Sequence, residues 1–171
     1  GILEKLNTLL LFPGAQIVGY APQFADYVRL AYTHGAIYQG VPLSGPEYRF
    51  SSTNVLEHLS SELALVYIDN PNNPTGQLIP LDEIEVILKR TMELSLLVIV
   101  DEAYGDFVAK KYSAMYLTTK YPNLVVVRSF SQGMGLAGLR IGYVVLGDKV
   151  RELYAKLDVP FNISRAAMAA A

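Results

Sequence analysis

The chain has 171 residues, 51% of them apolar, and a formal net charge of −2 at pH 7. This length and composition suit one well-buried globular domain, and the small charge gives no basic surface for nucleic acid or for an anionic membrane. The sequence has no cysteine, which excludes a disulfide framework and a thiolate metal site. Its first residues lack the pattern of a secretion signal. We therefore expect a cytoplasmic protein that acts on small molecules.

Helices and strands alternate along the first half of the chain. Apolar residues recur at helical spacing over 2–10, and Pro13-Gly14 ends that pattern before a strand begins at Gln16. The same alternation predicts the following elements: a helix over 27–32, a strand over 36–43, a helix over 54–63 and a strand over 65–68.

The second half continues the alternation with stronger signals. A helix is predicted over 80–90, because Pro80 precedes acidic residues in the first turn and Lys89-Arg90 end the pattern. Two continuous apolar runs follow, at 96–100 and 124–127, and both are typical of parallel strands covered on two faces. The run at 96–100 is far shorter than the ~20 residues that cross a bilayer.

The strand predicted over 139–146 follows the glycine-rich stretch Gly133–Gly138. Parallel neighbours need a crossover of about a dozen residues or more, so this short loop predicts an antiparallel pair. The fold class is therefore α/β, with three layers and a mostly parallel sheet that has one antiparallel strand. The stretch also matches the dinucleotide fingerprint G-x-G-x-x-G, and Asp158 lies at the expected spacing. Because a strand follows it and not a helix, we do not expect a nicotinamide or flavin site.

Three polar segments follow predicted strands: Asp69–Gly76, Asp101–Tyr104 and Ser129–Gln132. In open α/β sheets, ligands bind at the carboxyl ends of the strands. Each segment alone fits ordinary turn or helix-cap chemistry. Together they supply the amide, carboxylate, phenol and hydroxyl groups that a phosphorylated pyridine aldehyde requires.

With these segments, the sequence resembles the fold-type I pyridoxal-phosphate (PLP) aminotransferases of class I/II, most closely the histidinol-phosphate aminotransferase branch. The residues that carry the resemblance are Asn72–Gly76, Asp101–Tyr104 with Phe107, Ser129–Gln132 with Gly135–Tyr143, and Val159–Asn162. The resemblance implies that residues 1–158 form the large PLP-binding domain, incomplete at its N-terminus. Residues 159–171 would begin the segment that leads to a small domain.

The resemblance also implies roles for single residues. Asp101 would keep a proton on the pyridine nitrogen, which lets the ring accept electrons from the substrate. Tyr104 and Asn73 would hydrogen-bond the phenolic oxygen of PLP. Ser129 and Arg140 would bind its phosphate, the arginine through its bidentate fork.

Two further cofactor-binding residues follow from the same resemblance. Phe24 matches the position whose ring stacks on the pyridine, although a core aromatic residue at a helix start explains it equally well. Ser131 would be the second of these cofactor-binding residues. His34 and His58 are single and lack a spaced carboxylate partner, so we expect no metal site.

Gln132 departs from the family pattern, because the family has its catalytic Schiff-base lysine there. A glutamine amide is neither nucleophilic nor basic, so it can neither bond PLP covalently nor move the substrate proton. Either the glutamine disables the enzyme, or the protein is not an ordinary transaminase.

The resemblance implies an aminotransferase of amino-acid biosynthesis that acts on an amino acid or an amino-phosphate such as histidinol phosphate. Its partners would be an amino donor, a 2-oxo acid acceptor and a second subunit of a homodimer. Two alternatives stay open. One is a PLP-dependent lyase or decarboxylase, since the cofactor residues do not decide which substrate bond breaks. The other is a non-catalytic PLP-binding protein, which Gln132 favours.

Overall fold

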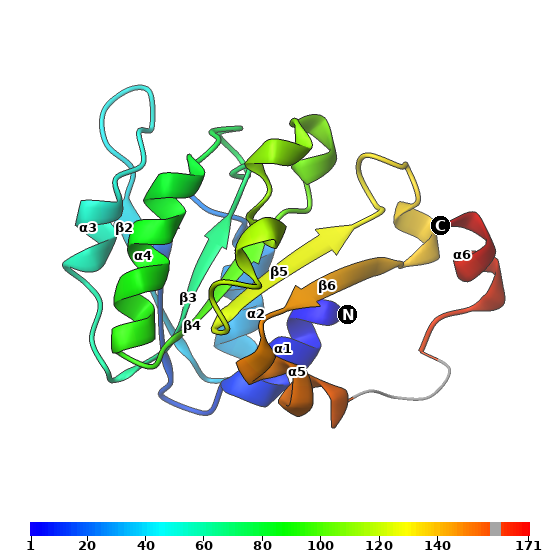
Figure 1. Cartoon of the computed structure of the whole chain (residues 1–171), viewed down its shortest axis with the longest axis horizontal. Coiled ribbons are helices and arrows are strands. Elements are labelled where there is room, and N and C mark those ends of the chain that lie inside the picture. Colours follow the sequence, from blue (N-terminus) through cyan, green and yellow to red (C-terminus); the bar gives the residue numbers. More distant parts are fainter. Residues whose placement is uncertain (158–161) are drawn as a thin grey trace.

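The computed structural model describes residues 1–157 and 162–171, and its centre is a six-stranded sheet (Figure 1). The strand order is β2-β1-β3-β4-β5-β6. The strands are β1 (Gln16–Ala21), β2 (Ile37–Pro42), β3 (Leu63–Asp69), β4 (Leu97–Asp101), β5 (Leu124–Ser129) and β6 (Gly142–Leu146). The first five in spatial order are parallel, and β6 pairs antiparallel with β5. The predicted mixed α/β sheet is confirmed.

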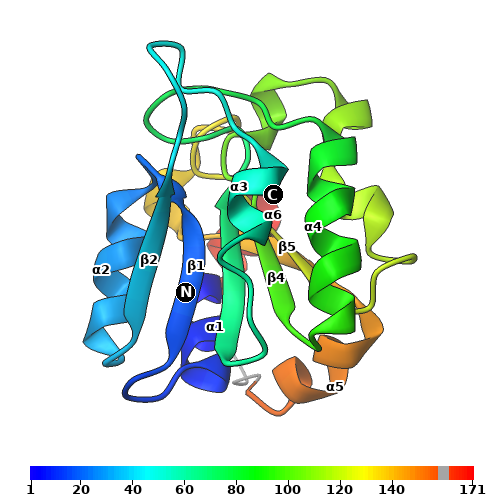
Figure 2. The same ribbon diagram turned by 90° about the vertical axis from the view of Figure 1, so that its left-hand side faces the viewer.

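Helices cover both faces of this sheet, with α2 and α4 on opposite sides (Figure 2). The α-helices are α1 (Ile2–Leu10), α2 (Ala25–Thr33), α3 (Ser52–Leu56), α4 (Leu81–Glu93), α5 (Asp148–Ala155) and α6 (Arg165–Ala170). Short 3₁₀ helices are η1 (Gly105–Phe107), η2 (Lys110–Tyr112), η3 (Ala114–Leu117) and η4 (Ala137–Leu139). None of the helices in the described parts of the chain is long and apolar enough to span a bilayer.

The core lies in two layers because neighbouring side chains of a strand point to opposite faces. Val66 and Val98 pack with Ile84 of α4 on one face. Leu65 and Ile99 pack with helices α1 and α2 on the other. Strands buried on both faces require the continuous apolar runs that the sequence contains.

Two predicted elements are shorter than expected. The helix predicted over 54–63 ends at Leu56, since Leu63 pairs with Gln16 in the sheet and the chain must turn before it. The strand predicted over 139–146 begins at Gly142, because Arg140 adopts a left-handed conformation with φ of 53°. No α-helix opens after the glycine stretch, so the dinucleotide interpretation finds no helix N-terminus there.

Some positions of interest lie outside the described residues. They are Asp158, the Val159–Phe161 part of the family motif, and the predicted domain boundary at 158/159.

Candidate active site

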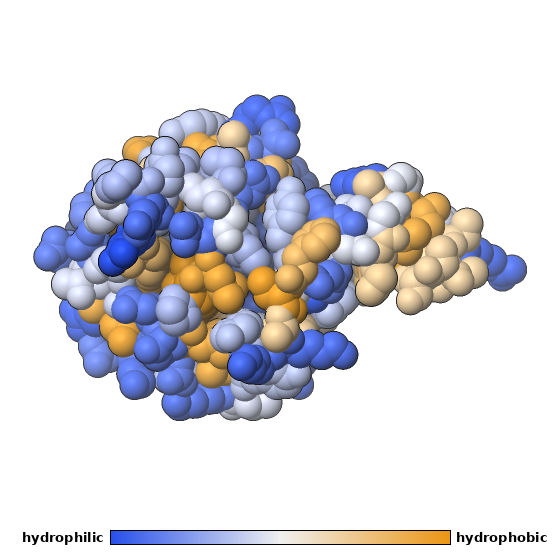
Figure 3. All heavy atoms as spheres, turned by 90° about the horizontal axis from the view of Figure 1, so that it is seen from above, coloured by the Kyte–Doolittle hydropathy of each residue, from blue (hydrophilic) through white to orange (hydrophobic). Residues whose placement is uncertain are grey.

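A small cavity of about 40 Å³ lies where β3 and β4 end. It is lined by Phe24, Asp69, Pro71, Asn73, Asp101, Ala103, Tyr104 and Gln132. Five of these were candidate site residues from the sequence, and they come from four separate segments. Seen from above in Figure 3, the face on which the parallel strands end combines apolar patches with hydrophilic surroundings. Such a mixture suits a small molecule with an apolar ring and polar substituents.

Asp101 ends β4 and is the buried carboxylate of this cavity. Its Oδ2 accepts a hydrogen bond from the Tyr67 hydroxyl at 2.8 Å, and its Oδ1 accepts one from the Ala103 N–H at 3.0 Å. Burial raises the pKa of Asp101 to about 6, although the two hydrogen bonds oppose the rise. A carboxylate poised in this way can hold a cationic N–H group inside the cavity.

Beneath Asp101, two tyrosine rings lie flat on one another. Tyr67 of β3 and Tyr27 of α2 have ring centroids 3.4 Å apart and planes inclined by 4°. Both rings are buried, and burial raises the pKa of both phenols far above the usual value, so both stay neutral. Sequence reasoning missed this pair, although a tyrosine inside the apolar run of β3 was a signal that a polar group ends in the core.

Asp69, at the end of β3, is a second buried carboxylate and lies opposite Asp101 in the strand register. Its Oδ1 accepts hydrogen bonds from Tyr20 Oη at 2.7 Å, Asn72 Nδ2 at 3.0 Å and Gln23 Nε2 at 3.3 Å. Its Oδ2 accepts one from the Asn73 N–H at 2.9 Å. From the sequence Asp69 is only part of a turn, because no local pattern reveals the donors Tyr20 and Gln23, which lie more than 40 residues earlier in the chain.

The predicted phosphate-binding residues do not line this cavity. Ser129 lies at the end of β5, where its hydroxyl accepts a hydrogen bond from the Ser131 N–H at 3.0 Å. Ser129 borders a second, neighbouring cavity. The exposed Arg140 donates from Nη1 to the Ala137 carbonyl at 2.8 Å. The structure thus brings together around one cavity the residues predicted to contact the cofactor ring. It does not bring the residues predicted to bind the phosphate to that cavity.

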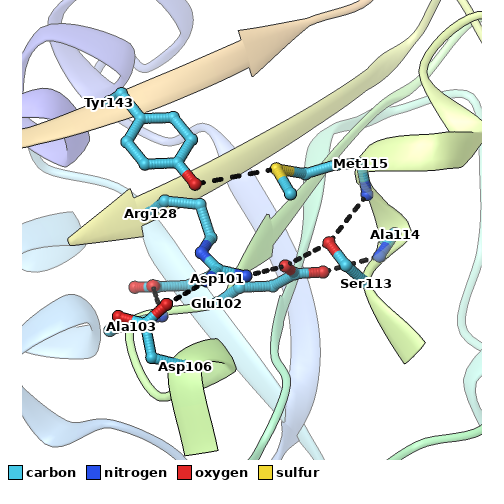
Figure 4. A network of polar contacts seen from close by, with 9 residues as sticks. All are labelled: Asp101, Glu102, Ala103, Asp106, Ser113, Ala114, Met115, Arg128 and Tyr143. Atoms are coloured by element: carbon cyan, nitrogen blue, oxygen red, sulfur yellow. Dashed lines mark hydrogen bonds and ion pairs between the residues drawn. The ribbon is translucent and has the colours of Figure 1, made fainter. Parts of the chain in front are cut away.

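A buried ion-pair network holds the segment that carries Asp101 and Tyr104 (Figure 4). Glu102 binds Arg128 Nη1 at 3.0 Å and accepts hydrogen bonds of 2.6 Å from the Ser113 hydroxyl and the Ala114 N–H. Arg128 also pairs with Asp106. These contacts of Glu102 and Arg128 join the segment after β4 to β5 and to the start of η3. The network therefore fixes the backbone on which Asp101 stands.

Gly105 allows this network to form. A Cβ atom built there would lie 2.5 Å from Arg128 Nη1, so any larger residue would displace the guanidinium.

The second cavity lies beside this network and is lined in part by Lys110, Arg128 and Tyr143. In the described part of the chain, no group of three or more acidic, histidine or cysteine side chains could hold a metal ion.

Comparison with known proteins relates this chain to one family. The model of the family described as Aminotransferase class I and II matches residues 1–171. Over 170 residues the chain is 36% identical to the histidinol-phosphate aminotransferase of Methanococcoides burtonii, covering 99% of this chain and 46% of that protein. It is 37% identical over 172 residues to that of Haloferax volcanii, covering 100% of this chain and 47% of that one.

A solved structure agrees with these relatives. The histidinol-phosphate aminotransferase of Sinorhizobium meliloti, crystallised in complex with pyridoxal-5'-phosphate, superimposes with a TM-score of 0.84 at 28% identity. The match covers 99% of this chain and 46% of that one. The chain thus spans about half the length of the relatives it matches.

Proposed function

This chain belongs to the aminotransferase class I and II family, and we propose that it forms most of the cofactor-binding domain of a PLP-dependent aminotransferase. The observation that carries the proposal is the cavity in which Asp101 lies with Phe24, Asn73 and Tyr104. These four residues come from three segments, and the fold brings them to the end of the sheet where ligands bind in α/β proteins.

The groups around this cavity fit the ring of PLP. Asp101 is buried and anionic above its pKa of about 6, so it can accept a hydrogen bond from a protonated pyridine nitrogen. When bound, PLP supplies an electron sink for bond breaking at the substrate Cα. The part played by Asp101 is to keep the ring nitrogen protonated, and Tyr67 keeps the Asp101 carboxylate in place.

Three other residues would orient the ring. We assign the Tyr104 hydroxyl and the Asn73 amide to the phenolic oxygen, and the Phe24 ring to one face of the pyridine. All three side chains border the same cavity as Asp101. An aromatic ring stacked on the pyridine excludes water from it and fixes its plane.

The phosphate would be bound by Ser129, Ser131 and Arg140. The role of Arg140 is supported by the contact that its side chain makes in this structure, which is an exposed hydrogen bond to the Ala137 carbonyl. Giving up such a bond costs little, whereas a guanidinium–phosphate pair is charge-assisted and bidentate.

Gln132 borders the cavity at the position of the family's lysine. Its amide cannot form a covalent link to PLP and cannot accept the substrate proton. We therefore propose that the chain holds PLP by non-covalent contacts alone and that transamination is strongly impaired. Gln132 also supports the second candidate function, a protein that binds PLP without catalysis.

The substrate that we propose is an amino-phosphate of the histidinol phosphate class, which is the substrate class named for the relatives above. Two further proposals concern the setting of the protein. A cysteine-free sequence suits the cytoplasm. A homodimer follows from the family resemblance.

Equilibrium dialysis against PLP tests the proposed function on the full chain. We expect saturable binding that Asp101→Asn weakens, because the amide cannot neutralise the pyridinium. The variant Gln132→Lys should then transfer the amino group of histidinol phosphate to a 2-oxo acid. The proposal fails if the unsubstituted chain shows no saturable PLP binding. A Gln132→Lys variant that binds PLP but transfers no amino group would favour the non-catalytic binder.

A further inference from the structure

Asp69 lies beside the proposed cofactor ring but has no part in the roles assigned so far. It borders the cavity, is buried, and stands next to Asp101 in the register of β3 and β4. Both of its carboxylate oxygens are directed at donors of the protein itself. It is therefore placed to act through other residues and not by binding a ligand directly.

One set of contacts reaches the segment that carries Asn73. Asp69 Oδ2 accepts the Asn73 N–H at 2.9 Å, and Oδ1 accepts a hydrogen bond from Asn72 Nδ2 at 3.0 Å. Asn72 in turn accepts a hydrogen bond from the Thr75 N–H at 3.1 Å. The Asp69 carboxylate therefore holds the Asn73 backbone, from which the Asn73 side chain projects.

A second set of contacts reaches the segment that carries Phe24. Gln23 Nε2 donates to Asp69 Oδ1 and to the Tyr67 carbonyl, both at 3.3 Å. Asn72 Nδ2 donates both to Asp69 Oδ1 and to the Pro22 carbonyl at 3.1 Å. Asp69 thus connects the two residues that directly precede Phe24 with the loop that precedes Asn73.

We infer that Asp69 is a positioning residue that sets Phe24 and Asn73 relative to each other around the cofactor ring. The inference rests on the proposed function. Its physical basis is that one carboxylate can connect two loops only while it is anionic and accepts from all of these donors. Binding groups must be held to about 0.5 Å for a productive geometry, and loops reach that precision only through such supporting contacts.

The rival explanation is that Asp69 merely stabilises its own turn. In that case its loss would lower the stability of the chain without changing how a bound ring is held. The spectrum of bound PLP separates the two explanations, because the circular dichroism induced in the cofactor depends on the asymmetry of its contacts.

The test uses the full chain with Asp69→Asn, which keeps the size of the side chain but turns an NH₂ group toward donors. The exposed Asp82→Asn in α4 is the matched control. We expect the PLP dissociation constant of Asp69→Asn to rise about 10-fold, because Phe24 and Asn73 lose their fixed relative position around the ring, and the induced circular dichroism of bound PLP to fall. Asp82→Asn should change neither. Unchanged dichroism in a folded Asp69→Asn chain would overturn the inference.

A second measurement needs no cofactor and keeps the two proposals apart. In the apo chain, Asp69→Asn should shift the NMR resonances of both the Asn73 amide and the Phe24 ring, because the carboxylate connects both segments. A shift of Asn73 alone refutes the inference even if PLP binds. If the unsubstituted chain fails to bind PLP, the proposed function fails, while these apo shifts still decide the positioning role. Should Asp69→Asn not fold, Asn72→Ser removes the amide that links Asp69 Oδ1 to the Pro22 carbonyl and should shift the Phe24 ring.

Discussion

The hydroxyl of Tyr67 donates a hydrogen bond of 2.8 Å to Oδ2 of Asp101. Tyr67 lies in β3 and Asp101 ends the neighbouring strand β4, so the bond crosses between two strands of the central sheet. Burial raises the pKa of Asp101, and this hydrogen bond acts against the rise because it stabilises the anion. The carboxyl therefore titrates at about 6 and is ionised at neutral pH.

Tyr67→Phe isolates the effect of this hydrogen bond. The phenylalanine ring can keep the stacking on Tyr27, while Asp101 loses a donor to its charged form. We expect the pKa of Asp101 to rise further above 6 and the free energy of unfolding at pH 8 to fall by about 1–3 kcal/mol. Carboxyl ¹³C NMR measures the first and urea denaturation the second. An Asp101 carboxyl that titrates at its original pH would show that the hydrogen bond has no effect on it.

Asp101→Asn tests how burial of this carboxylate affects stability. The folded pKa of about 6 lies above the ordinary aspartate pKa of 3.8, so the folded chain binds the proton more tightly than the unfolded chain. The contribution of Asp101 to stability is therefore fully present below about pH 4 and is lost as the pH rises through 6. A difference of about two pKa units corresponds to about 3 kcal/mol.

We therefore expect Asp101→Asn to gain stability relative to the unsubstituted apo chain as the pH rises from 4 to 7. Urea denaturation across this range measures the difference, in which the titration of all other groups cancels. Asp82→Asn, on the exposed side of α4, is the control. A constant difference between Asp101→Asn and the unsubstituted chain would contradict the raised pKa.

Most of the fold was predictable because each local signal agreed with the global arrangement. The apolar runs of β4 and β5 can be buried only in a sheet covered on both faces, and the short glycine-rich loop requires an antiparallel neighbour. The helix predicted over 54–63 was too long, since pairing of Leu63 with Gln16 is a contact distant in sequence. No periodicity within the segment reveals such a contact.

A site residue was predictable from the sequence only where it belongs to a short motif near the end of a strand. Asp101 ends β4, and Tyr104 and Asn73 lie in the short segments that follow β4 and β3, so the sheet brings them together. The supporting residues Tyr67 and Asp69 escaped prediction, because Tyr67 bonds to Asp101 of another strand and Asp69 accepts bonds from the distant Tyr20 and Gln23. Arg140 was predicted beside the phosphate, but its side chain direction depends on the left-handed backbone at that residue.

The ion pair between Arg128 and Glu102 should be important for stability, because both side chains are buried. Arg128→Met leaves the Glu102 carboxylate without its cation, which we expect to lower the free energy of unfolding by about 3–5 kcal/mol. Arg128→Met combined with Glu102→Gln removes the uncompensated negative charge of Glu102 and should recover a large part of this loss. Urea denaturation at pH 7.5 measures both variants.

Lys120→Met is the matched control for Arg128→Met. It breaks an ion pair of 2.6 Å with Glu85 that lies on the surface, and such pairs contribute little. Equal losses from Arg128→Met and Lys120→Met would contradict the importance of burial for the Arg128 pair.

Gln132→Lys tests the chemistry at the departure from the family pattern. Gln132 borders the cavity and is exposed, so a lysine amine placed there can reach a carbonyl carbon bound beside Asp101 without crossing the core. The amine is a nucleophile and a base, whereas the amide is neither. After borohydride treatment and denaturation, we expect Gln132→Lys to retain PLP and the unsubstituted chain to retain none above background. Lys110 and Lys111 are present in both proteins, so they contribute equally to that background.

The same substitution should restore turnover in the full chain. General acid–base catalysis contributes about 10²–10⁴-fold, and Gln132→Lys restores it together with the covalent link, so the rate of amino transfer should rise by at least this factor. PLP affinity should change less than the rate, because Asp101, Tyr104 and Asn73 border the cavity in both proteins. Stopped-flow assays of amino transfer at saturating PLP measure the rate. Equal rates from the two proteins would mean that another residue supplies the amine, and that position 132 does not carry the family's chemistry in this chain.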